Sequence, residues 1–242
     1  MPDRFEHHFA TVRLELTAYL CRLVNRPHVA EELAQTAFLR LLESGSAAPD
    51  QDEAIRAWLF RVATNLAIDE LRRHSTWRET MVEDLRSAAE SNTEFNSFSS
   101  SLIGTPETKL VAREHLATCF GCTMRNLPEH KAAAFWLKEV HSFSLAEAAD
   151  FLGATEAQVK NWLQEARAFM RARYASSCAL IAKQGVCYQC VELADYFKSG
   201  EPNPLTGSAD DLDARLSILR EMRSRPPGVW HARLLRLIDD LD

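Results

Sequence analysis

Apolar residues recur at helical spacing along most of this chain. The clearest case lies in residues 55–73, where an apolar stripe repeats every three or four positions. The stripe consists of Ile55, Leu59, Val62, Leu66 and Ile68. Residues 5–23 and 28–43 carry comparable stripes, and nothing in this part of the chain alternates with the period of two that is typical of strands. Residues 1–78 are therefore predicted to form an all-helical domain, with a loop at 44–53.

A second row of side chains lies off the apolar stripe of the third predicted helix. Trp58, Arg61 and Asn65 step by three and four residues, so they share one face. A ring can stack, a guanidinium can meet phosphate and an amide can contact a base edge, so this row suits nucleic acid. Arg72 and Arg73 close the helix, where they complement its dipole. The alternative is an amphipathic core helix whose polar face is simply solvated.

A second helical domain is predicted over residues 106–175. Its first two helices, 106–127 and 128–140, each open with a proline, which suits the first turn of a helix. Ser144 and Glu147 then form a capping-box pattern, Gly153 supplies a turn, and a threonine two residues later caps a longer helix. Short helix, glycine turn and longer helix are typical of a helix-turn-helix, with a plain helical hairpin as the alternative.

The segments on either side of this second domain differ in composition. Residues 79–105 are rich in Ser and Asn and are predicted to form a linker, in which two phenylalanines and two aliphatic residues would anchor on a partner's surface. Residues 176–242 form a tail with amphipathic patches at about 211–222 and 229–241.

Composition narrows the class of protein. The chain has 242 residues, 46% hydrophobic and 26% charged, which is ordinary for a globular protein of two small domains and an appendage. The formal net charge of −6 argues against nucleic-acid binding driven by bulk charge, although local basic strips remain compatible with it. We find no apolar run long enough to span a bilayer and no signal-peptide core, so we expect a cytoplasmic protein without membrane contact.

Two blocks of sequence resemble a known family. The sequence WLFRVATNLAIDELRR, residues 58–73, resembles conserved region 2 of the bacterial extracytoplasmic-function (ECF) sigma factors, and EELAQTAFLRL, residues 31–41, resembles the helix before it. The helix-turn-helix resembles sigma region 4. The matching positions there are Leu127, Pro128, Ser144, Glu147, Ala149, Val159, Lys160, Leu163, Ala166 and Arg167. The resemblance implies an all-α protein with a region 2 domain at 1–78, a polymerase-docked linker at 79–105 and a region 4 domain at 106–175.

The resemblance also implies partners and roles. Core RNA polymerase would be met by Glu32, Gln35, Phe38 and Arg40. Promoter DNA would be contacted at the −10 element by Trp58, Arg61, Asn65, Arg72 and Arg73, and at the −35 element by Gln158, Lys160, Asn161 and Gln164. The chain departs from the family at Trp162 and Glu165, where basic residues are usual, and this should weaken the salt-dependent part of DNA affinity.

Five of the six cysteines fall into two groups. Cys119 and Cys122 lie in the first helix of the second domain, and Cys178, Cys187 and Cys190 lie in the tail. Two C-x-x-C pairs can complete a tetrahedral thiolate site, so Cys119, Cys122, Cys187 and Cys190 are predicted to bind zinc, with Cys178 as an additional ligand and copper or cadmium as alternative metals. A redox pair and ordinary buried cysteines are the alternatives.

The tail is similar in layout to that of a metal-responsive ECF subgroup, in which such an extension replaces a separate anti-sigma factor. We therefore interpret the chain as an ECF sigma factor, not an enzyme, whose cysteine-bearing tail (176–242) controls it. The alternative is a metal- or redox-dependent interaction protein that binds polymerase without initiating transcription.

Overall fold

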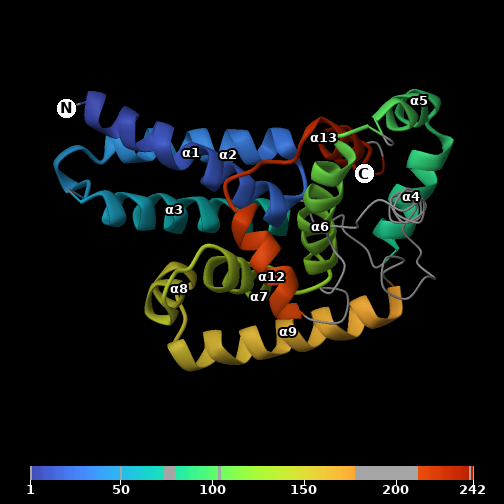
Figure 1. Cartoon of the computed structure of the whole chain (residues 1–242). Coiled ribbons are helices and arrows are strands. Elements are labelled where there is room, and N and C mark those ends of the chain that lie inside the picture. Colours follow the sequence, from blue (N-terminus) through green and yellow to red (C-terminus); the bar gives the residue numbers. More distant parts are fainter. Residues whose placement is uncertain are drawn as a thin grey trace.

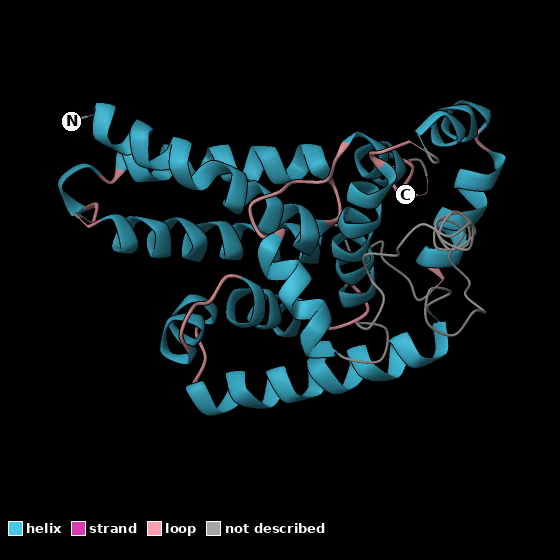
Figure 2. Ribbon diagram, in the orientation of Figure 1, coloured by secondary structure: helices cyan, strands magenta, loops and turns pink. Residues whose placement is uncertain are grey.

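In the computed structural model, residues 2–49, 51–73, 80–102, 105–177, 212–239 and 241 are described, and all their regular elements are helices, which confirms the predicted all-α class (Figures 1 and 2). The elements are α1 (Pro2–Val24), α2 (Pro27–Glu43), the 3-10 turn η1 (Gly45–Ala47), α3 (Asp52–Arg73), α4 (Met81–Ser91), α5 (Thr93–Leu102), α6 (Thr108–Met124), α7 (Glu129–Phe135), the π-helical η2 (Trp136–Val140), α8 (Leu145–Leu152), α9 (Glu156–Ser177), α12 (Leu212–Glu221) and α13 (Val229–Arg236).

The first three helices pack side by side into an N-terminal domain (Figure 1). The chain reverses between α1 and α2 at Asn25, whose φ of 57° is left-handed, and Pro27 then opens α2. α3 begins at Asp52, earlier than predicted, because Asp52 and Glu53 place negative charge at its positive end. Ile55 and Leu59 from the predicted stripe are fully buried in the core of this domain.

The predicted linker contains two helices, α4 and α5, which its Ser/Asn-rich composition did not predict. Asn92 opens α5, since its side-chain oxygen accepts a hydrogen bond from the backbone N–H of Phe95 at 2.8 Å. Phe95 is buried against Trp230 of α13, with ring centroids 5.5 Å apart. The aromatic anchors expected to meet a partner protein therefore contact the chain's own C-terminal segment.

The second domain, α6 to α9, contains the predicted helix-turn-helix. The backbone N–H of Glu147 donates to Ser144 Oγ at 3.1 Å, and the Ser144 N–H donates to the Glu147 carboxylate at 2.7 Å, which confirms the capping box of α8. Gly153 ends α8 with a left-handed φ of 59°. Thr155 and Gln158 repeat the reciprocal capping pattern at the start of α9.

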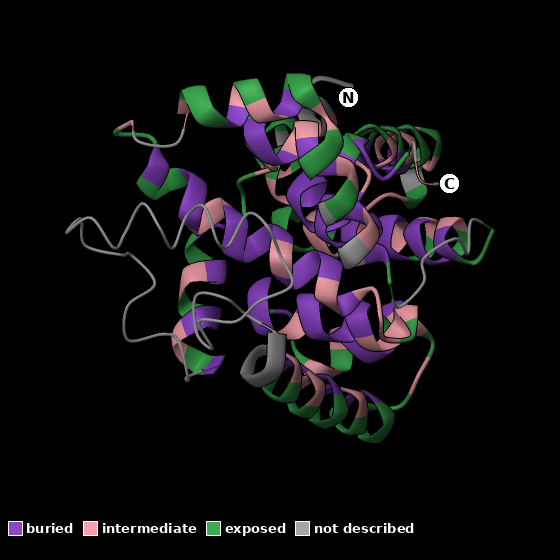
Figure 3. Ribbon diagram, turned by 90° about the vertical axis from the view of Figure 1, so that its right-hand side faces the viewer, coloured by how far each residue is buried: buried purple, intermediate pink, exposed green. Residues whose placement is uncertain are grey.

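The two domains pack directly against each other, with α8 on α3 and α6 on α1. Phe60 is fully buried although it lies off the predicted stripe, because Phe143 of the second domain covers it at a ring-centroid distance of 4.9 Å. At the other crossing Gly121 allows close approach, since a Cβ there would lie 2.8 Å from Asn25 Oδ1. Figure 3 shows buried residues along the helices inside the molecule, while α9 is exposed on its outer side.

Two described helices follow the second domain, and they agree with the amphipathic patches predicted in the tail. α12 lies between α9 and the N-terminal domain, and α13 lies beside α6 and α5 (Figure 1). Leu216, Trp230 and Leu235 bury their side chains almost completely. Residues 212–239 are therefore a packed part of the fold, and we refer to them as the C-terminal clamp.

Candidate nucleic-acid interface

The predicted DNA-contacting row of α3 lies at the edge of the interface between the domains. Trp58 is partly buried and packs against the core, whereas Asn65 is exposed and its amide donates to the Arg61 carbonyl at 3.0 Å. The Arg61 guanidinium lies 3.4 Å from the carboxylate of Asp150 in α8. One member of the row is thus partly a core residue, and another is paired with the second domain.

The basic end of α3 is engaged in a similar way. Arg72 donates to the carboxylate of Glu129 in α7 at 2.7 Å, and Arg73 pairs with Glu70 of its own helix at 3.1 Å. Arg61 and Arg72 both contact acidic side chains of the second domain, so these two cations are partly neutralised by the chain itself. Such half-exposed ion pairs are weak, about 0.2–1 kcal/mol each, and phosphate groups could replace the carboxylates.

The other predicted DNA-contacting surface is open. Gln158, Lys160, Asn161 and Gln164 are all exposed on α9, while Val159, Leu163 and Ala166 face the core. The amide oxygen of Gln158 accepts hydrogen bonds from the backbone N–H and the hydroxyl of Thr155, at 2.9 and 3.0 Å. This bond holds the Gln158 side chain at the N-terminus of α9, leaving its amide nitrogen as the group for an outside partner.

The two unusual residues of α9 have partners inside the second domain. Trp162 is partly buried and packs on His130 of α7, with ring centroids 4.5 Å apart. Glu165 forms an ion pair with Lys131, also in α7. Among the described residues of the tail, α12 meets α9 at a different position, where Asp213 lies 3.3 Å from Arg167.

Three of the four predicted polymerase-binding residues share the outer side of α2. Glu32, Gln35 and Arg40 are exposed, and Leu39 beside them is 56% exposed. Phe38 is half-buried instead, since it stacks on Phe9 of α1 at 4.2 Å. This exposed strip, with one large apolar residue among polar ones, is suited to a protein partner.

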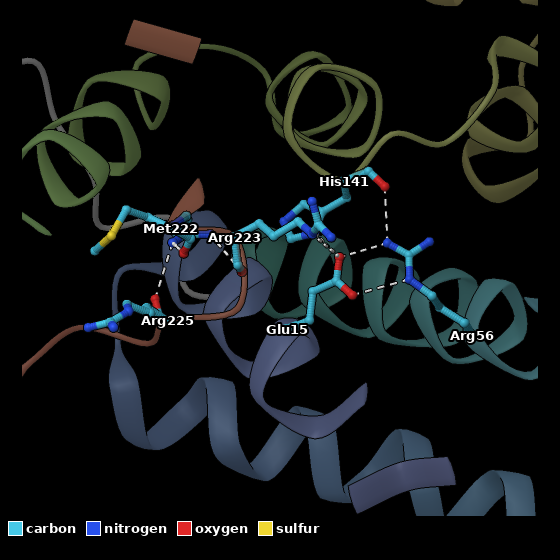
Figure 4. A network of polar contacts seen from close by, with 7 residues as sticks. Glu15, Arg56, His141, Met222, Arg223 and Arg225 are labelled. Carbon is cyan, nitrogen blue, oxygen red and sulfur yellow. Dashed lines mark hydrogen bonds and ion pairs between the residues drawn. The ribbon is translucent and has the colours of Figure 1, made fainter. Parts of the chain in front are cut away.

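A partly buried polar network joins the two domains, and sequence reasoning missed it (Figure 4). Arg56 of α3 donates to both carboxylate oxygens of Glu15 in α1, at 3.2 and 2.7 Å, and to the backbone carbonyl of His141 at 3.0 Å. The His141 Nδ1 lies 2.9 Å from the same carboxylate. Burial would raise the pKa of Glu15, but the hydrogen bonds from His141 and Arg56 lower it to about 2. The only signal in the sequence is that the charged residues Glu15 and Arg56 lie on helices that also carry apolar stripes.

The cysteine prediction is only partly covered by the described residues. Cys119 and Cys122 lie on α6, partly exposed and buried respectively, and neither forms a disulfide with a described residue. Cys178, Cys187 and Cys190 lie outside the described residues. Within the described ranges, no group of three or more His, Cys, Asp or Glu side chains is arranged to hold a metal ion. Cys21, predicted as a core residue, is buried in α1, and burial raises the pKa of its thiol to about 12.

Comparison with known proteins identifies both domains. Residues 9–76 match Sigma-70 region 2, and residues 117–170 match Sigma-70, region 4. The chain is 24% identical to the ECF RNA polymerase sigma factor SigG of Mycobacterium tuberculosis, in strains CDC 1551 / Oshkosh and H37Rv, over 188 residues that cover 67% of this chain and 46% of SigG. It is 28% identical to the ECF RNA polymerase sigma factor SigW of Bacillus subtilis over 156 residues, which cover 63% of this chain and 79% of SigW.

The chain thus spans about half the length of the SigG proteins that it matches. None of the described helices is long and apolar enough to cross a membrane. The matched region 2 range contains α2 and α3, and the matched region 4 range contains the capping box and the helix-turn-helix. With both regions matched and with their ranges together covering half of its length, this chain belongs to the sigma-70 family.

Proposed function

We propose that this protein is an ECF-type sigma factor that binds core RNA polymerase, directs it to promoters and initiates transcription. The observation that carries the proposal is the joint presence of two surfaces on matched domains. One is the exposed strip of α2, and the other is the exposed amide and lysine face of α9. No step of chemistry is assigned to the protein itself, because polymerase would supply the catalysis.

The positions of the side chains indicate which promoter element each one would contact. Trp58, half-buried beside an exposed polar face, would wedge against or stack on bases of the −10 element once the face is free. Lys160 would meet phosphate at the −35 element, while the exposed amide of Asn161 would contact base edges in the major groove.

Run-off transcription tests the proposal. Core polymerase is mixed with this protein and a library of promoter fragments from its own genome, and the transcripts are sequenced. We expect transcripts that depend on the protein, and we expect Trp58→Ala to reduce open-complex formation more than polymerase binding. A protein that binds core polymerase but yields no transcript would instead be the alternative interaction protein, which the absence of basic residues at Trp162 and Glu165 would favour.

A further proposal concerns the cysteines. We propose that Cys119 and Cys122 bind zinc, copper(I) or cadmium together with Cys187 and Cys190, with Cys178 as an additional ligand, and so couple the tail to metal. Its support is the chemistry of the donor set and the spacing of Cys119 and Cys122, three apart on one helix. Metal content of anaerobically purified protein is the test. The Cys187→Ser/Cys190→Ser variant should lose metal, and unchanged content would reject the site.

A further inference from the structure

The second helix of the helix-turn-helix begins with a side chain that is already engaged at one of its two polar ends. Gln158 is the third residue of α9, and its amide oxygen accepts hydrogen bonds from the Thr155 backbone N–H at 2.9 Å and from the Thr155 hydroxyl at 3.0 Å. The Gln158 backbone N–H donates in return to Thr155 Oγ at 3.2 Å. This reciprocal cap fixes the side chain before any partner binds.

The cap uses the full accepting capacity of the Gln158 amide. A carboxamide oxygen has two lone pairs, and Thr155 engages both of them, whereas the amide nitrogen carries two N–H donors. Gln158 is exposed, so its amide nitrogen is left for an outside partner. A glutamine with a free side chain presents an acceptor and a donor next to each other. Gln158, held by its cap, presents donors alone.

The position of Gln158 along α9 is suited to contact with bases. In a helix-turn-helix, the residues near the N-terminus of the second helix contact base edges in the major groove. α9 runs along the outside of the molecule, and Val159 and Leu163 turn inward to the core (Figure 1). Gln158 and Asn161 lie one turn apart on exposed positions, with the exposed cation Lys160 between them to meet phosphate.

The four bases differ in what they offer to a group that can only donate. In the major groove, guanine presents two neighbouring acceptors, O6 and N7, whereas adenine presents the acceptor N7 beside the N6 amino donor. Thymine presents the acceptor O4 beside a methyl group, and cytosine presents only its N4 donor. A free glutamine pairs with both groups of adenine. A capped glutamine would place its own donor against the N6 donor of adenine, so guanine is the base that suits it best.

We propose that Gln158 selects guanine at one position of the −35 element, because Thr155 holds its amide oxygen and leaves only its donors for the base. Thr155 is then a positioning residue for base recognition. The inference rests on the proposed function, in which α9 enters the major groove at the −35 element, and it adds the class of base that this site recognises.

The test is a selection from promoters randomised across the −35 element, with holoenzyme assembled from core polymerase and the full-length protein. Gln158→Ala identifies the base pair that Gln158 contacts, as the position at which a preference is lost. We expect the native protein to prefer guanine over adenine there by about fivefold or more.

Gln158→Glu separates the cap from the contact with the base. A carboxylate oxygen accepts the same hydrogen bonds from Thr155, so the cap is kept, but the side chain has no donor. The preference should therefore change from guanine to cytosine, whose N4 group donates. Gln164→Glu is the matched control, since it adds the same charge to an exposed position of α9 outside the cap and should leave guanine preferred at that position.

Thr155→Val tests the positioning role. It removes the hydroxyl donor and frees a lone pair of the Gln158 oxygen, so adenine should become about as acceptable as guanine at the same position, while preferences elsewhere stay as they are. A cap with a purely structural role would change stability and leave the base preference alone. Circular dichroism shows whether the helices persist, and if this variant loses them, Gln158→Glu decides the question.

Each outcome of the selection decides the inference. It is overturned if the native protein prefers a base other than guanine at the Gln158 position, if Gln158→Ala changes no preference, or if Gln158→Glu keeps guanine. An unchanged preference in a folded Thr155→Val variant overturns the role of the cap. If the native holoenzyme selects no −35 sequence at all, the proposed function itself fails, and that result differs from selection of a −35 element with another base at this position.

Discussion

Acid should destabilise this fold, because His141 is buried as a neutral imidazole where the two domains meet. The side chain is fully buried, and burial lowers its pKa to about 4, with nearby Arg22 and Arg56 adding to the effect and the hydrogen bond to Glu15 opposing it. Arg223 also faces this carboxylate, 3.8 Å away. Three cations therefore lie around one carboxylate and disfavour a fourth positive charge on the imidazole.

The size of the effect follows from linkage. In the unfolded chain His141 protonates near its usual pKa of 6.5, whereas in the folded protein it stays neutral down to about 4. The unfolded state therefore binds more protons in this window, so stability falls as the pH falls through it, by about 2 kcal/mol between pH 7.5 and pH 5. His231 in the clamp, whose pKa burial also lowers to about 4, contributes a loss of similar size. Glu15, whose pKa is lowered in the folded protein, contributes a further loss of stability only as the pH falls below 4.5, its usual pKa.

Urea unfolding at a series of pH values, followed by fluorescence of the buried Trp136 and Trp230, measures this loss. The native protein should lose about 4 kcal/mol between pH 7.5 and pH 5, and His141→Gln, which can still donate to Glu15 but does not titrate, should lose only about half as much. His7→Gln, at an exposed position of α1, is the control. A His141→Gln variant with the native pH dependence would refute the reasoning.

Three further predictions concern packing, capping and promoter binding. Gly121→Val should destabilise the protein by about 1–3 kcal/mol in urea unfolding, because its side chain would enter the contact with Asn25; no measurable loss of stability would contradict the close crossing. Ser144→Ala should cost about 1 kcal/mol of stability through loss of the capping box, and no measurable cost would contradict its role. Lys160→Ala should weaken binding to all −35 sequences about equally and lower the salt dependence of that binding. Asn161→Ala should instead change which bases are preferred in a selection experiment.

Local signals in the sequence determined most of the helices and both domains. Prolines at 27 and 128 and the left-handed turn at Gly153 are properties of single residues, and the capping box of Ser144 and Glu147 is formed within four residues. Such features act through neighbouring backbone, so they persist whatever packs around them. The exposed positions of Lys160, Asn161 and Gln164 follow in the same way from the period of α9.

Tertiary structure alone decided how the domains meet. Periodicity places Phe60 off the core stripe and Arg22 at the end of an amphipathic helix, yet both are buried, because other elements cover them from far along the chain. The helical linker has the same cause, since Phe95 and Ser99 gain partners on α13 that composition does not reveal. Contacts between residues 89 to 200 positions apart depend on the spatial arrangement of whole elements, so the packing of the two domains against each other and against the clamp could be found only in the folded protein.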